Sequence, residues 1–161
     1  MERVNDLQSE TYERMNERLA QTLRRISPEE LPEFLSQEKG LLITGGRPFA
    51  DYMRRKLREK GVLQQNVFLA ADLSEAYGYK LIAEEKHTRQ RDTILRLCLA
   101  AGFRLEEVQE ALIRYGMAPL YARLARDAVL IAAVQHEMYD LEAVNRLLTR
   151  CGQPPLVRDY A

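Results

Sequence analysis

The sequence predicts an all-α protein. Apolar residues recur at steps of three and four along most of its 161 residues, which is the spacing of amphipathic helices. Glycines and prolines stand between these stretches, where helices end and turns begin. No stretch alternates polar and apolar residues as a half-buried strand does, and the one β-like run, 41–44, is too short to build a sheet.

Composition places the chain among globular proteins. It is 46% hydrophobic and 30% charged, and its 24 basic and 24 acidic residues give a formal net charge of zero. These values exclude a disordered chain and a histone-like polycation. The longest apolar run, 128–134, is far shorter than the ~20 residues of a membrane helix, and the first residues lack a signal-peptide core. With two cysteines and no disulfide framework, we expect a cytoplasmic protein without membrane contact.

The N-terminal segment predicts two helices. The first carries an apolar stripe of Val4, Leu7, Thr11, Met15, Leu19, Leu23 and Ile26. A second helix is expected to begin with Ser27 as N-cap and Pro28 in its first turn, and Glu30 would complete a capping box. It should run to about Gln37, before Gly40.

A linker and a run of short helices follow. Residues 39–48 hold three Gly and one Pro, so we place a domain boundary after residue 46. The expected helices span 49–60, 64–71, 74–83, with Ser74 as N-cap, and a fourth stretch through 94–99 that Gly102 stops. We assign residues 47–102 to one domain. The middle third of the chain, residues 47–104, has 12 basic and 7 acidic residues and so a net charge of +5. The segments before and after it are both net acidic.

The C-terminal region, 103–161, contains a repeat. Residues 105–120 align with residues 141–156 at an offset of 36, and eight of the sixteen positions are identical, including the Gly and Pro that end each unit. Arg91-Asp92 and Arg126-Asp127 open an apolar helix upstream of each copy, one residue out of step. Each unit is therefore expected to be a helical hairpin, and the two hairpins should stack because neither can bury its apolar side alone.

The helices expected at 64–71 and from Ser74 are spaced like those of a helix-turn-helix. In that motif the second helix lies in the major groove and presents its first residues to base edges, while flanking groups hold phosphates. The expected base-facing residues are Ser74, Glu75, Ala76, Tyr79 and Lys80. The expected phosphate contacts are Gln64 and Gln65 before them, and Lys86, His87, Arg89 and Arg91 after them. The amides at the start of the second helix could also hold a phosphate, since helix N-termini attract anions.

These features resemble the lambda-repressor-like helix-turn-helix domain of the Cro and XRE type. The similar elements are a first helix at 49–61, a helix and turn at 64–73, a recognition helix at 74–81 and a closing helix at 94–99. Four motifs are also similar to a group of largely uncharacterised Gram-positive helix-turn-helix proteins with an appended helical region: Tyr77-Gly78-Tyr79, Arg91-Asp92, Pro119-Leu120-Tyr121 and Arg126-Asp127. The resemblance spans residues 49–156. It implies a cytoplasmic transcriptional regulator that reads double-stranded DNA, for which a two-fold dimer is the usual arrangement.

Several positions depart from the family's pattern. Phe68 stands where Ala is usual, and Gly78 stands inside the recognition helix where Ile or Val is usual. Asp72 replaces the Gly of the turn, and Glu84-Glu85 and Thr88-Arg89 replace Gly and Pro in the next loop. Asp tolerates the left-handed conformation that such a turn needs. Glycine in a helix interior costs about 1 kcal/mol relative to Ala. We ascribe the presence of Gly78 to the close approach of another helix.

Two functions follow from these observations. In the first, the middle segment reads DNA while the terminal regions form a homodimer or sense a partner. In the second, the same fold is a protein-interaction adaptor without DNA contact, and the stacked hairpins hold a protein partner. The second is motivated by Glu75, Glu84 and Glu85, because these carboxylates repel a polyanion.

We expect neither catalysis nor a bound cofactor or metal. His87 and His136 are far apart, and neither has a Cys or carboxylate at metal-ligand spacing. Cys98 lies on an apolar helical face and is expected in the core, and Cys151 has no activating neighbour in sequence. The segment 45–48 lacks the strand and the Lys-Ser/Thr pair of a phosphate-binding loop.

Overall fold

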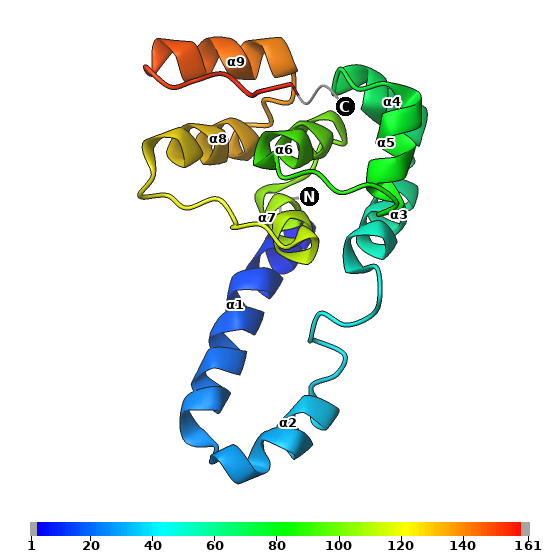
Figure 1. Ribbon diagram of the computed structural model, residues 1–161. Coiled ribbons are helices and arrows are strands. Elements are labelled where there is room, and N and C mark those ends of the chain that lie inside the picture. The colour runs from blue at the N-terminus through cyan, green and yellow to red at the C-terminus, as the bar shows by residue number, and fades with distance from the viewer. Residues whose placement is uncertain (1–2, 159–161) are drawn as a thin grey trace. The chain divides into compact units, whose positions relative to one another are not determined.

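A computed structural model describes residues 3–158, and the side chains of residues 14–158. Every regular element in that range is helical, which confirms the all-α prediction (Figure 1). The chain divides between Gly46 and Arg47 into two units, each compact in itself.

The first unit holds α1 (Arg3–Arg25), the 3-10 turn η1 (Pro28–Glu30) and α2 (Leu31–Gln37). The capping box expected at Ser27 does not form. The Ser27 hydroxyl instead donates to a Glu30 carboxylate oxygen at 3.2 Å and accepts no backbone N–H. A 3-10 turn follows because the Glu30 N–H bonds to the Ser27 carbonyl three residues back.

The described part of the second unit contains α3 (Pro48–Lys60), α4 (Gln64–Ala70), α5 (Glu75–Ile82), α6 (Arg91–Ala100), α7 (Leu105–Tyr115), α8 (Ala125–Gln135) and α9 (Leu141–Arg150). These positions confirm the helices expected from the sequence, and several of the helices end at the stop signals that the sequence carries. Gly61 and Gly116 adopt left-handed φ angles of 66° and 87° just past α3 and α7.

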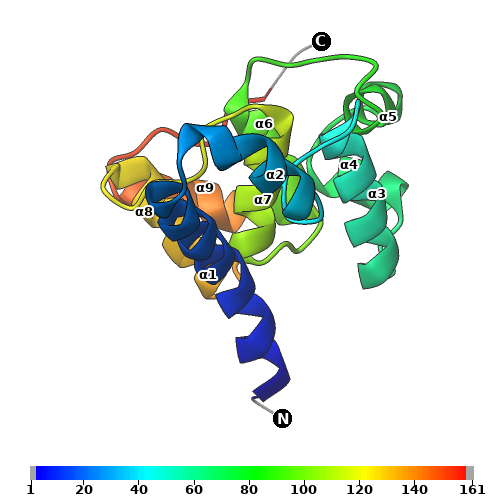
Figure 2. The same cartoon turned by 90° about the horizontal axis from the view of Figure 1, so that it is seen from below.

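One continuous core runs through the second unit. α6 lies at its centre, and every residue from Asp92 to Leu99 is buried. α3, α4 and α5 lie on one side of α6 and α7, and α8 and α9 lie on the other (Figure 2). The core does not divide at residue 102, since Phe49 of α3 and Leu156 beyond α9 belong to the same cluster. Gly102 ends a helix inside this core, and a helix end in a compact unit carries the same sequence signals as a domain boundary.

The repeat forms two helical hairpins that pair reciprocally. α6 and α7 make the first hairpin, and α8 and α9 make the second. α6 also contacts α9, and α7 contacts α8, so exchanging the hairpins leaves the pattern of contacts unchanged. A solenoid would place each repeat behind the last. The duplication therefore resembles an isologous dimer built within one chain.

Candidate nucleic-acid interface

A turn between α4 and α5 fixes the direction in which α5 departs. Asp72 adopts a left-handed φ of 56°, and its N–H bonds to the Leu69 carbonyl at 3.2 Å. Ser74 has an extended backbone, and its Oγ accepts a hydrogen bond from the Tyr77 N–H at 3.3 Å. The predictions of a break at Asp72 and an N-cap at Ser74 are confirmed.

α5 has one buried side and one exposed side. Tyr77, Gly78, Leu81 and Ile82 are buried. All the residues of this helix start that the sequence assigned to base contacts are exposed: Ser74, Glu75, Ala76, Tyr79 and Lys80. Lys80 and Glu75 make no ion pair within the described residues. The outward side of α5 thus carries one positive and one negative charge, both open to a ligand.

Phe68 and Gly78 explain each other. A Cβ at Gly78 would overlap the ring of Phe68, so no side chain fits there while the ring is in place. Phe68 is fully buried, and its ring meets the Tyr79 ring edge-on at a centroid distance of 4.9 Å. α4 and α5 therefore approach closely at the glycine, which is the kind of contact inferred from the sequence. The large side chain of Phe68 on α4 fills the space that a side chain at Gly78 on α5 would need.

The turn is tied to the end of the second unit through Arg96. Its side chain is only 4% exposed, and its guanidinium donates to the Ala71 and Val157 carbonyls, both at 3.0 Å. It also lies 3.5 Å from the Asp72 carboxylate, which Arg158 approaches to 3.4 Å. Residues 157 and 158 therefore brace the turn from which α5 begins.

A second brace joins the start of α3 to the end of α5. Glu84 accepts a hydrogen bond from the Ala50 N–H at 3.1 Å and so caps α3. Arg47 donates to the Ala83 carbonyl, just past α5, at 3.0 Å. The carboxylate and the guanidinium each complement the dipole of the helix they cap. Glu84 is therefore a structural group and not only a negative charge beside the candidate interface.

The other predicted contacts lie at the start of α4 and in the connector after α5. Gln64 is half-buried, and the remaining ones are exposed: Gln65, Lys86, His87 and Arg89. The Lys86 ammonium lies 5.9 Å from the centre of the buried Tyr77 ring. The His87 ring stacks on Tyr115 at 4.3 Å.

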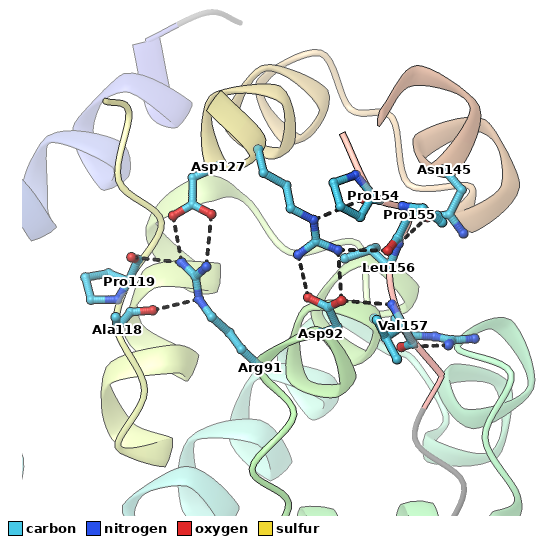
Figure 3. A network of polar contacts seen from close by, with 12 residues as sticks. Arg91, Asp92, Ala118, Pro119, Asp127, Asn145, Pro154, Pro155, Leu156 and Val157 are labelled. Carbon is cyan, nitrogen blue, oxygen red and sulfur yellow. Dashed lines mark hydrogen bonds and ion pairs between the residues drawn. The ribbon is translucent and has the colours of Figure 1, made fainter. Parts of the chain in front are cut away.

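Arg91 is not available for a phosphate contact. Its guanidinium donates to both carboxylate oxygens of Asp127 at 2.9 Å, and to the carbonyls of Ala118 and Pro119 (Figure 3). The sequence placed Arg91 near DNA because it follows the connector. The fold instead turns it inward as a link between the hairpins.

Arg126 repeats this arrangement in the second hairpin. It donates to both carboxylate oxygens of Asp92, at 2.7 and 2.8 Å, and to the carbonyls of Pro154 and Pro155. Arg91 and Arg126 thus exchange partners, each binding the aspartate of the other copy. Figure 3 labels Arg91 and both aspartates. The repeated Arg-Asp dipeptide was the signal for this network, but the sequence alone did not indicate that its partners cross between copies.

The Asp127 carboxylate is held in its charged form. Burial alone would raise its pKa, but hydrogen bonds from Arg91 and from the Tyr121 N–H, with the Arg91 charge, hold the pKa below its usual value. Asp92 is bonded in the same way by the Val157 N–H at 2.8 Å. Both aspartates therefore tie a helix start to the extended segment that follows the facing hairpin.

Two of the basic residues of the middle segment form ion pairs between α3 and α7. The Lys60 ammonium lies 2.9 Å from the buried Glu107 carboxylate, and that of Lys56 lies 3.8 Å from it. Burial would raise the pKa of Glu107, but the Arg104 N–H and Lys60 outweigh it and lower the pKa. These two lysines stabilise the core, so the charge of +5 overstates what can face a polyanion.

The other candidate chemical groups have structural positions. Cys98 is fully buried, as predicted, and burial raises the pKa of its thiol, so it is unreactive. Cys151 is exposed. Among the residues described, no group of His, Cys, Asp and Glu could hold a metal ion. No helix in the described range is long and apolar enough to cross a membrane.

Comparison with known protein families, with curated proteins and with solved structures gives no match for this chain. The candidate interface therefore rests on its own geometry: an exposed helix side, capped at its start and braced at both ends.

Proposed function

We propose that residues 47–158 bind double-stranded DNA as a helix-turn-helix, with α5 in the major groove, and that the protein is a transcriptional regulator. The observation that carries this proposal is the outward side of α5. Its side chains are exposed, while the opposite side is locked into the core. A helix held in this way can be inserted into a groove without rearrangement. A two-fold dimer would place two such helices on paired half-sites.

The charges near α5 support binding of moderate strength. Lys86 and Arg89 are exposed and can approach phosphates, and the exposed Lys80 can contact a base edge. Glu84 caps α3, which removes one objection to DNA contact. Glu75 faces outward at the first position of α5, where a carboxylate can accept a hydrogen bond from the N4 amino group of cytosine. Specificity for a cytosine at that position follows from this assignment.

Binding to duplex DNA tests the proposal. Genomic fragments selected with the purified protein should bind with a log affinity that falls with log salt by about 0.9 for each phosphate neutralised. Lys80→Ala and Arg89→Ala should each weaken binding, and each lost phosphate contact should reduce the slope by about one. Fluorescence anisotropy at a series of salt concentrations measures both effects.

Arg123→Ala is the matched control, because Arg123 is exposed in the connector between α7 and α8, outside the candidate interface. Its affinity and slope should equal those of the unaltered protein. The proposal is wrong if no genomic fragment binds at ~50 mM salt, where electrostatic binding is strong.

A second function, a protein-interaction adaptor on the same scaffold, is favoured by Leu69. This side chain is 81% exposed and lies four residues after Gln65, on the same side of α4. An exposed leucine fits a protein contact better than a phosphate contact. Leu69→Lys distinguishes the two functions, because added positive charge should preserve or tighten DNA binding but abolish an apolar protein contact.

A further inference from the structure

The two hairpins are related by a two-fold arrangement, but the helix that covers one side of the first hairpin has no equivalent on the second. On the first hairpin, α3 packs along α7. α9 packs against α8 and α6, and no other described helix of the second unit takes the place along α9 that α3 takes along α7. The duplicated element therefore has two equivalent sides, of which α3 covers one.

Burial at equivalent positions differs accordingly. On the covered side, Glu107 and Ala111 of α7 are buried. Their counterparts 36 residues later, Ala143 and Leu147 of α9, are only half-buried. We define the uncovered face as Ala143 and Leu147 of α9 with Ile131 and Ala132 of α8. Ala132 is exposed and the other three are half-buried, and Ile131 and Leu147 also pack against the core. Apolar residues on such a face bind a partner more readily than they remain in water.

The charged residues at equivalent positions of the two sides differ. On the covered side, the acidic Glu107 binds Lys56 and Lys60 of α3. Beside the uncovered face, α9 has Ala143 in place of Glu107 and the exposed Arg146 in place of Glu110, while the exposed Arg150 matches Arg114 of α7. The Arg146 side chain is 69% exposed, and its contact with Glu142 at 4.0 Å is at the limit of an ion pair. The uncovered face therefore favours acidic residues, where the covered side favours basic ones.

We propose that the uncovered face binds an amphipathic helix of another protein, with acidic residues beside its apolar stripe. α3 is the internal precedent, because it is an amphipathic helix of 13 residues that fills the equivalent position. A helix of that length is about 20 Å long, so the interface is small and we expect reversible binding. This proposal does not depend on DNA binding, because it concerns a different surface.

A synthetic peptide tests the proposal on the full chain. The probe is a labelled 21-residue peptide with leucines at steps of three and four and glutamates on both flanks, and its binding is followed by fluorescence anisotropy. We expect saturable binding that falls at least about tenfold for the double variant Arg146→Glu/Arg150→Glu. Ala132→Gln should also weaken it, because a longer, polar side chain without charge then occupies the apolar face.

Matched controls separate this contact from general charge attraction. Arg123→Glu should bind the peptide as the unaltered protein does, and a peptide with lysine in place of every glutamate should bind more weakly. The proposal is overturned if the acidic peptide does not saturate, if the lysine peptide binds equally well, or if the double variant has no effect. It is also overturned if the full chain self-associates and the double variant abolishes that association, since a second copy would then occupy the face.

Discussion

At the scale of single residues, Phe68 and Gly78 show how two departures from a family's pattern can compensate each other. The ring of Phe68 fills the space that a side chain at position 78 would need. Gly78 lies in the interior of α5, where glycine is unfavourable. The packing of α4 against α5 explains why glycine stands there. Sequence could indicate that something approaches the glycine, but not that the neighbour is Phe68.

We expect Gly78→Ala to destabilise the protein by about 1–3 kcal/mol, because the new methyl group overpacks a rigid ring. Adding Phe68→Leu should recover part of this loss, since leucine vacates some of the ring's volume. Gly40→Ala is the control: its Cβ would meet nothing within 4 Å, so its effect should stay within about 0.5 kcal/mol. Urea unfolding of the four proteins measures these changes, and equal stability of the single and double variants would contradict the steric explanation.

The Asp127 carboxylate makes a contribution to stability that depends on pH. Its pKa is lower in the folded protein than in the unfolded chain, because Arg91 and the Tyr121 N–H outweigh the effect of burial. The contribution is therefore complete above the ordinary pKa of about 3.9 and is lost as the pH falls through the lower folded value. Asp127→Asn should cost about 2 kcal/mol at pH 7, because it weakens hydrogen bonds to a charged group, and progressively less as the pH falls below about 4. Unfolding curves at several pH values test this, with the exposed Glu85→Gln as a control that should change little; a cost independent of pH would contradict it.

At the scale of elements, the helices were predictable and their partners were not. Ser74, Gly61 and Gly116 are local signals, so the start of α5 and the ends of α3 and α7 could be placed from neighbouring residues. The candidate interface shares this local character, which is why most of its residues lie where they were expected. The crossed pairing of Arg91 and Arg126 is set by the packing of the hairpins, and spacing along the chain carries no information about it.

The two hairpins differ at one helix end in a way that can be measured. Gly102 follows α6 with a left-handed φ of 68°, and Glu137 follows α8 with a left-handed φ of 55°. The Glu137 conformation strains a residue with a side chain by about 1–2 kcal/mol, whereas glycine adopts it freely. Glu137→Gly should therefore stabilise the protein by up to about 1 kcal/mol, and Gly102→Ala should destabilise it by a similar amount. Thermal unfolding compares them, and a loss of stability in Glu137→Gly would contradict the assigned strain.

At the scale of the whole molecule, the continuous core of the second unit predicts a single unfolding transition for residues 47–158. Leu57 of α3 and Leu148 of α9 both lie in that core, on opposite sides of α6. Arg96 and Asp92 further tie the segment after α9 to the turn before α5 and to α6. The helix proposed to enter DNA is thus coupled to the hairpins that carry the uncovered face.

Leu57→Ala and Leu148→Ala should each destabilise the protein by about 2–5 kcal/mol, because each leaves a cavity in the same core. If the second unit unfolds as one, both variants lower the midpoint of the same transition, whether it is followed by tyrosine signals or by helix content. Calorimetry provides an independent check, since the calorimetric and van't Hoff enthalpies of a two-state unit agree. A Leu148→Ala variant in which α8 and α9 melt first, while the rest keeps its midpoint, would show that this hairpin unfolds separately and that the Arg–Asp exchange does not couple it to α4 and α5.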